Sequence, residues 1–175
     1  DRKELVIALL PGSRMGELKA HTDTLLETAQ NLLEVHPDAK FLIPATNDKN
    51  VHFIKGRIRN NPTKNLKLIK GKVDEILSSS NIAIAASGTA SLQIALHKKP
   101  MIIIYKGSWI SYFIWKMVRL IPNVSLPNIL LNENFVPEML QHRATPNLLS
   151  EKACKIINDK KYSKKLESKF NRLHK

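Results

Sequence analysis

The stretch that decides the fold is residues 81–106, NIAIAASGTASLQIALHKKPMIIIYK. It contains two continuous apolar runs, Ile82–Ala86 and Met101–Tyr105, which are typical of strands buried on both faces of a parallel sheet. Between them, apolar side chains recur at helical spacing, and Pro100 ends that helix. A strand, a helix and a strand in this order form a βαβ unit, which predicts a right-handed crossover and a parallel sheet.

The loop between the first of these strands and the helix is Ser87-Gly88-Thr89. The first N–H groups of a helix have no backbone partner and carry partial positive charge. Gly88 lets the backbone approach a ligand, and the two hydroxyls add donors, so the loop suits a diphosphate. We expect Thr89 or Ser87 to cap the helix. The alternative is an ordinary strand-to-helix turn, because Ser-Gly-Thr is short and common.

A second loop, Pro11-Gly12-Ser13-Arg14, follows the apolar strand expected at residues 5–10. Ligand sites in open α/β sheets lie outside the carboxyl ends of the strands, so this loop is also placed for binding. The guanidinium of Arg14 offers a fork of donors that suits a phosphate. The alternative is a surface arginine without a ligand.

The rest of the chain alternates between apolar runs and amphipathic segments. We expect strands at residues 41–45 and 66–69, the second at a sheet edge, and a strand-like run at 129–131. Expected helices cover residues 16–36, 50–60, 73–80, 146–157 and 162–173. His21, in the first of these helices, is expected to face solvent. Without an internal repeat or a long linker, the sequence predicts one α/β domain over residues 1–175, closed by helices within 146–175.

The chain is strongly basic, since 28 Lys and Arg against 15 Asp and Glu give a formal net charge of +13. Basic chains favour anionic partners such as nucleic acid, anionic lipid or phosphorylated substrates. The lysine-rich C-terminal segment also fits a solvated helix face, and no zinc-finger spacing or RNA-binding signature is present. The single cysteine excludes an intrachain disulfide, and no apolar run approaches the roughly 20 residues of a membrane span.

Residues 109–121 interrupt the α/β pattern with a segment that is apolar almost all round a helix. Trp109 and Phe113 are among its aromatic residues, and Lys116 and Arg119 punctuate it with charge. One interpretation is an interfacial helix that rests on a membrane with its cations toward anionic lipid. The other is a core helix between the sheet and a missing partner domain.

The segment after residue 122 shows little periodicity and contains two expected proline turns, Pro127-Asn128 and Pro137-Glu138. The amide of Asn128 donates and accepts at once, which suits recognition of a sugar or a nucleotide. The alternative is an ordinary turn asparagine after a proline.

Four motifs occur in order along the chain: PGSR, ASGTASL, SLPNILL, and VPEMLQ followed by ATP. Over residues 9–149 they resemble the C-terminal half of lipid-A-disaccharide synthase, a bacterial inverting glycosyltransferase. That family is similar in fold to the two-domain GT-B glycosyltransferases. The resemblance implies a Rossmann-like open parallel sheet with helices on both faces. It also implies that this half binds the nucleotide-sugar donor, while the N-terminal acceptor domain is absent from this chain.

The implied reaction transfers 2,3-diacylglucosamine from UDP-2,3-diacylglucosamine to 2,3-diacylglucosamine 1-phosphate, giving the lipid A disaccharide phosphate and UDP. The resemblance implies a cytoplasmic enzyme, peripheral at the inner membrane, that needs no metal or cofactor and binds no nucleic acid. A homodimer is one assembly that it allows. Because the acceptor site and the general base are expected in the missing half, we expect this chain to be inactive alone.

The implied site residues fall within the four motifs and the aromatic segment. Arg14 and Asn128 are the expected catalytic residues, and Arg14 would act with the helix start after Gly88 on charge that develops on the leaving UDP. The expected UDP-sugar contacts are Gly12, Ser13, Arg14, Ser87, Gly88, Thr89, Gln93 and Asn128, and the expected lipid contacts are Trp109, Phe113, Lys116 and Arg119. Gln93 departs from the family, which usually has a glutamate there to hold the ribose hydroxyls. Glutamine accepts through its carbonyl oxygen but lacks the charge.

Three other hypotheses remain open at this point. A UDP-sugar epimerase-like GT-B domain would share the fold, but it does not account for the SLPN motif or the aromatic segment. A basic nucleic-acid-binding domain would show salt-dependent binding to DNA. A non-catalytic interaction module is the third.

Overall fold

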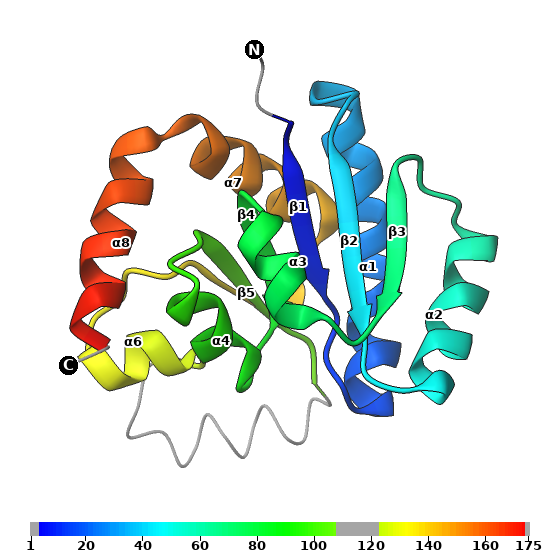
Figure 1. Ribbon diagram of the computed structural model, residues 1–175, viewed down its shortest axis with the longest axis horizontal. Helices are drawn as coiled ribbons and strands as arrows, with labels where there is room; N and C mark the ends of the chain where they lie inside the picture. The colour runs from blue at the N-terminus through cyan, green and yellow to red at the C-terminus, as the bar shows by residue number, and fades with distance from the viewer. Residues whose placement is uncertain (1–3, 108–122, 174–175) are drawn as a thin grey trace.

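The computed structural model of the protein describes residues 4–107 and 123–173. These residues contain a six-stranded sheet with the order β3-β2-β1-β4-β5-β6, in which all neighbouring strands are parallel (Figure 1). The strands are β1 (Val6–Leu10), β2 (Lys40–Ala45), β3 (Leu66–Lys70), β4 (Ile82–Ala86), β5 (Met101–Tyr105) and β6 (Glu138–Leu140). The predicted parallel α/β sheet is confirmed, and β3 lies at an edge as expected.

Helices cover both faces of the sheet (Figure 1). Helices α1, α2 and α7 pack on one face, and α3, α4 and α8 pack on the other, with α6 against α4 and α8. Their bounds are α1 (Met15–Val35), α2 (Asp48–Asn60), α3 (Val73–Ser79), α4 (Ala90–Leu96), α6 (Leu126–Leu131), α7 (Pro146–Asn158) and α8 (Lys160–Leu173). A short 3-10 helix, Gln141–Arg143, follows β6.

The two faces of the sheet form separate cores because side chains alternate along each strand. In β1, Ile7 and Leu9 belong to the core under α1, α2 and α7, whereas Ala8 and Leu10 belong to the core under α3, α4 and α8. Since both faces are covered, every position of the strand is apolar. This double burial explains why the central strands appear in the sequence as continuous apolar runs rather than as alternating patterns.

Three expectations for the segment after residue 122 are wrong: the turn at Pro127-Asn128, the strand-like run at 129–131 and the turn at Pro137-Glu138. Residues 129–131 are not strand-like but belong to helix α6, in which Pro127 occupies the first turn. Proline is favoured there because the first N–H groups of a helix have no intrahelical partner to lose. The expected turn at Pro137-Glu138 instead begins β6, a three-residue edge strand that pairs with β5 through Ile103 and Glu138.

The aromatic segment at residues 109–121 lies outside the described residues, and so do its four expected lipid contacts Trp109, Phe113, Lys116 and Arg119. Within the described ranges, the helices are all too short or too polar to cross a bilayer.

Candidate functional site

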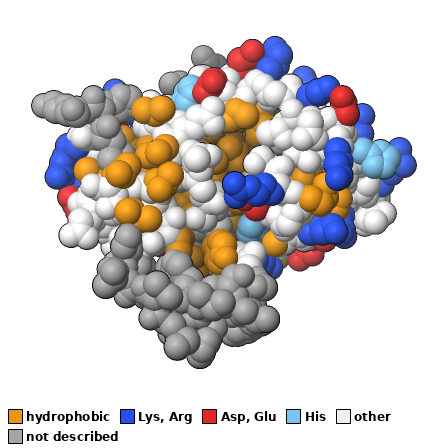
Figure 2. All heavy atoms as spheres, turned by 90° about the horizontal axis from the view of Figure 1, so that it is seen from below, with side chains coloured by type: hydrophobic (Ala, Val, Ile, Leu, Met, Phe, Trp, Pro, Cys, Tyr) orange, Lys and Arg blue, Asp and Glu red, His pale blue; other side chains and the backbone are white. Residues whose placement is uncertain are grey.

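A pocket of about 360 Å³ opens at the carboxyl ends of β1, β2 and β4. The strand order reverses between β1 and β4, and ligands of open α/β sheets bind at such a switch point. Of the expected UDP-sugar contacts, the pocket lining contains Gly12, Ser13, Arg14, Ser87, Gly88, Thr89 and Gln93. Figure 2 shows this edge of the sheet, with hydrophobic side chains near the middle of the face and a group of basic side chains among them.

A larger depression, of about 1040 Å³, lies between α1 and α7 and is lined by residues such as Asn31, Val35 and Cys154. It contains no residue of the loops that follow β1 or β4. We take the smaller pocket as the candidate site because its position at the switch point is where this class of sheet binds ligands.

The loop after β1 is shaped by a carboxylate that the sequence analysis did not identify. Glu17 Oε2 accepts hydrogen bonds from the backbone N–H of Ser13 (2.8 Å) and of Arg14 (3.2 Å). Gly12 has φ +109°, and a Cβ there would lie 2.3 Å from Glu17 Oε2, so only glycine fits. The Arg14 guanidinium lies 3.6 Å from Glu17 Oε1, but its side chain is 86% exposed. It is therefore free to move toward a ligand in the pocket.

The loop after β4 presents backbone donors to the pocket. Gly88 has φ +145°, and a Cβ at this position would meet nothing within 4 Å. The N–H groups of Gly88 and Thr89 have no hydrogen-bond acceptor among the described residues. The expected helix cap is wrong: neither hydroxyl caps α4, and Ser87 Oγ instead donates to the carbonyl of Val124 (2.8 Å). The loop is thus tied to the segment before α6, and its Gly88 and Thr89 N–H groups have no acceptor within the described part of the chain.

Asn128 is fully buried and does not line the pocket. Its Nδ2 donates to the carbonyl of Val136 and to Glu138 Oε1, both at 2.9 Å. Its Oδ1 accepts from the N–H groups of Phe135 (3.1 Å) and Val136 (2.9 Å). Because both amide hydrogens and the oxygen are engaged, the structure assigns Asn128 to holding α6 against the chain before β6. A direct contact with a ligand would require these hydrogen bonds to break.

Glu138 is the centre of this internal network. Its carboxylate also accepts from the N–H groups of Val124 (2.9 Å) and Ser125 (3.0 Å) and from the Ser125 hydroxyl (2.7 Å). These N–H groups belong to the N-cap residue of α6 and to the residue before it, so Glu138 fixes from β6 the chain that leads into α6. Since Ser87 also bonds the carbonyl of Val124, the network extends to the pocket wall.

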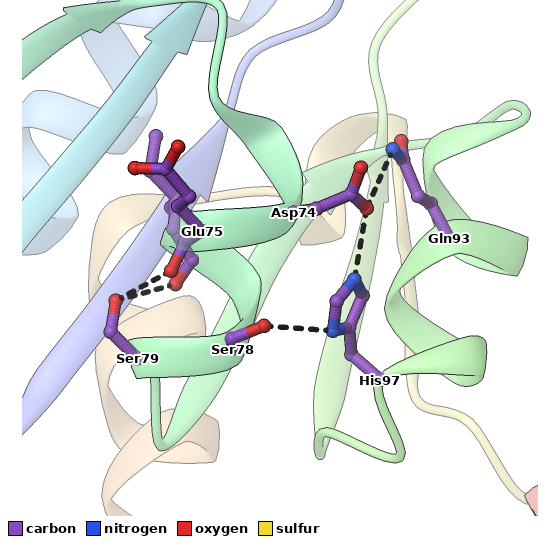
Figure 3. Close-up of polar contacts among 7 residues, drawn as sticks. Asp74, Glu75, Ser78, Ser79, Gln93 and His97 are labelled. Carbon is purple, nitrogen blue, oxygen red and sulfur yellow. Dashed lines mark hydrogen bonds and ion pairs between the residues drawn. The ribbon is translucent and has the colours of Figure 1, made fainter.

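Gln93 lies in α4 and lines the pocket. Its amide is hydrogen-bonded to a residue of α3 that is not part of the pocket lining. Gln93 Nε2 donates to Asp74 Oδ1 (3.2 Å), and His97 Nε2 lies 2.9 Å from the same oxygen (Figure 3). The other ring nitrogen of His97 lies 3.2 Å from Ser78 Oγ. The hydrogen bonds from His97 and Gln93 lower the pKa of Asp74, so the carboxylate stays ionised at neutral pH.

His21 was expected to face solvent, but it is buried beneath the loop after β1. Its Nδ1 lies 3.2 Å from the carbonyl oxygen of Pro11, and its Nε2 accepts from the N–H of Lys106 (3.0 Å). These partners assign the neutral tautomer with the proton on Nδ1. Burial lowers the pKa of His21 below its ordinary value. A neutral imidazole therefore joins the carboxyl ends of β1 and β5.

Of the functional residues that the sequence analysis missed, only Glu17 could have been found from its local sequence. Glu17 stands three residues after Arg14, at the spacing of a capping box. Glu138 and Asp74 had no local signal, because their partners come from other elements. No group of three or more metal-binding side chains occurs within the part of the chain that the structure describes.

Residues 1–175 match the sequence family described as lipid-A-disaccharide synthetase. The chain belongs to the lipid-A-disaccharide synthetase family. The lipid-A-disaccharide synthase of Dechloromonas aromatica is 38% identical to it over 173 residues, which is 97% of this chain and 45% of that protein. This family member therefore spans less than half the length of that relative, as the sequence resemblance to a C-terminal half predicted.

Solved structures show the same fold in other proteins. UDP-GlcNAc 2-epimerase from Neisseria meningitidis, bound to UDP-GlcNAc, matches with a TM-score of 0.65 at 16% identity, over 95% of this chain and 40% of that one. The ADP-heptose lipopolysaccharide heptosyltransferase II of E. coli matches with a TM-score of 0.62 at 11% identity, over 90% and 47%. At these identities the likeness concerns fold alone, and it confirms the predicted half of a GT-B architecture. It is the family match that separates this chain from the epimerases.

Proposed function

We propose that this chain is the donor-binding half of a lipid-A-disaccharide synthase. The complete enzyme would transfer 2,3-diacylglucosamine from UDP-2,3-diacylglucosamine to 2,3-diacylglucosamine 1-phosphate and release UDP. The observation that carries the proposal is one pocket, in a chain of this family, that is lined by Arg14 and by Gly88 and Thr89, whose N–H groups have no acceptor among the described residues. The net charge of +13 favours anionic substrates of this kind.

The proposed role of the pocket is to hold the diphosphate while charge develops on it. As the bond to the sugar breaks, negative charge grows on the leaving UDP, and donors that are already in place stabilise it. The Gly88 and Thr89 N–H groups supply fixed donors, and Arg14 supplies a mobile positive charge. Gln93 contributes an acceptor for the sugar or the ribose from the wall of α4.

The partners of this half are also proposals. An N-terminal domain would supply the acceptor site, and a homodimer is a further proposed assembly. We propose that the protein acts in the cytoplasm at the inner membrane surface, with Trp109 and Phe113 in the lipid contact. Sedimentation with anionic vesicles tests that contact, since changing both residues to Ser should reduce vesicle binding and leave UDP affinity unchanged.

Titration of the chain with UDP in the presence of EDTA tests the donor site, followed by calorimetry or by NMR. We expect weak, saturable binding with shifts confined to the loops after β1 and β4, and the same binding when Mg²⁺ replaces EDTA. Arg59→Ala, an exposed arginine on α2 outside the pocket, is the matched control for Arg14→Ala. Absence of binding at millimolar UDP, or a strict requirement for a divalent metal, would contradict the proposal.

A further inference from the structure

The side chains of Asp74, Gln93 and His97 form a cluster at the rim of the pocket, where α3 meets α4. Gln93 belongs to the pocket lining, and so does Val73, the neighbour of Asp74 in the chain. Figure 3 shows that the amide nitrogen of Gln93 and the imidazole of His97 both point at one carboxylate oxygen of Asp74. The cluster therefore reaches the pocket through Gln93 and is anchored outside it by His97.

The carboxylate of Asp74 determines which end of the Gln93 amide is left for the pocket. A glutamine amide carries donors at one end and an acceptor at the other, and a free amide can present either end. An ionised carboxylate is an acceptor only, so Asp74 selects the NH₂ end. Gln93 Oε1 has no donor among the described residues. Within the described chain, the pair thus leaves Oε1 of this pocket-lining residue as an acceptor.

His97 keeps Asp74 in this position. Its Nε2 lies 2.9 Å from Asp74 Oδ1, and because an ionised carboxylate only accepts, that nitrogen carries a proton; its Nδ1 lies 3.2 Å from the Ser78 hydroxyl. Asp74 is otherwise 73% exposed, and an exposed carboxylate without a second partner would move freely. Asp74 Oδ1 therefore has two partners, Gln93 within α4 and His97 at the C-terminal end of α4. Together they hold the carboxylate against Gln93.

We propose that Asp74 is a positioning residue that makes Gln93 a fixed acceptor for the ribose hydroxyls of a nucleoside diphosphate, and so selects ribonucleotides over 2′-deoxyribonucleotides. This rests on the proposed function and extends it, because it assigns a role to a residue outside the pocket lining. Gln93 stands one helical turn after Thr89, about 6 Å along the axis. That offset suits a nucleotide whose diphosphate lies at the loop after β4 and whose ribose lies beside α4.

The proposal also accounts for the glutamine itself. A glutamate at this position would supply both the acceptor and the charge from one side chain. Here the acceptor is Gln93 Oε1, and the negative charge lies one hydrogen bond further away, on Asp74. The double variant Asp74→Asn with Gln93→Glu exchanges the carboxylate and the amide between the two positions. The pair then still has one charge and one amide. The exchanged pair should therefore preserve ribose recognition.

The experiment compares the affinity of the chain for UDP and for 2′-deoxy-UDP by calorimetry. We expect the wild type to favour UDP, and Asp74→Ala to weaken UDP binding between about two- and tenfold while 2′-deoxy-UDP binding hardly changes. The exchanged pair should restore the preference. Glu75→Ala is the control, since Glu75 is exposed on the same helix and pairs with Lys72. Circular dichroism of each variant shows that it is folded.

Each other outcome overturns the proposal in a distinct way. If UDP binds and Asp74→Ala keeps the wild-type preference for UDP, Asp74 does not position Gln93, and the donor site itself still stands. Equal weakening of both nucleotides would give Asp74 a general structural role instead. If the exchanged pair does not restore the preference for UDP over 2′-deoxy-UDP, Gln93 and Asp74 do not together replace a glutamate. If no variant and not even the wild type binds UDP at millimolar concentration, the proposed function fails, and the inference fails with it.

Discussion

The exposed guanidinium of Arg14 gives the sharpest test of how the pocket handles charge. Among the described residues its side chain meets only Glu17, at 3.6 Å, and it is 86% exposed. Such an ion pair stabilises a fold by about 0–1 kcal/mol, so Arg14→Ala should leave the free energy of unfolding almost unchanged. If Arg14 meets charge on the leaving diphosphate, its loss should raise the barrier by about 2–4 kcal/mol, or roughly 10²–10³ in kcat.

The assay measures kcat and KM for UDP-2,3-diacylglucosamine in a protein that carries this chain together with its proposed N-terminal half. Because the contact strengthens as the transition state forms, kcat should fall more than KM rises. Arg14→Lys should recover part of the loss, since it restores a charge without the fork of donors. Arg59→Ala should behave as the wild type. A wild-type kcat in Arg14→Ala would refute this reasoning and leave Arg14 as a surface residue.

Two further predictions concern the groups that hold the pocket loops. Because burial lowers the pKa of His21 below 6.5, the unfolded chain binds more protons below that pH, and the free energy of unfolding should fall from pH 6.5 toward pH 5. Urea unfolding should show a smaller fall in His21→Asn than in the wild type or the exposed control His52→Asn, and equal slopes would argue against it. Glu138→Gln places an NH₂ group among four donors and should cost about 1–3 kcal/mol, or roughly 2–4 °C in Tm per kcal/mol. Exposed Glu27→Gln should leave Tm unchanged, and the same Tm in both variants would contradict this role.

The central sheet could be predicted from the sequence because burial on both faces leaves an unusual local pattern. Strands β1, β4 and β5 are apolar at almost every position, and such runs between amphipathic segments are typical of the inner strands of a parallel sheet. Strand β6 has only three residues, too few for a recognisable sequence pattern. It is a strand because it pairs with β5. Helix α6 was misassigned because Ile129-Leu130-Leu131 is a short apolar run, for which helix and strand look alike.

The two pocket loops could also be predicted, because their place depends only on which strands precede them. The groups that hold these loops could not. His21 receives its hydrogen bond from Lys106, which is 85 residues away, and a lone helical histidine carries no sign of such a partner. The partners of Asn128 could not be predicted either. Its capacity to donate and accept was evident, but its partners lie beside it in the fold rather than in a ligand.

The distribution of carboxylates limits where a diphosphate can bind in the pocket. Glu17 already occupies the N–H groups of Ser13 and Arg14, so a phosphate there would have to displace a carboxylate and face its charge. Among the described residues, the N–H groups without an acceptor belong to Gly88 and Thr89 on the opposite loop, and the exposed cation is the side chain of Arg14. The loop after β4 should therefore supply the fixed contacts and the loop after β1 the movable one. On the proposed function, Glu17 would be the partner of Arg14 before binding, and a bound diphosphate would take its place.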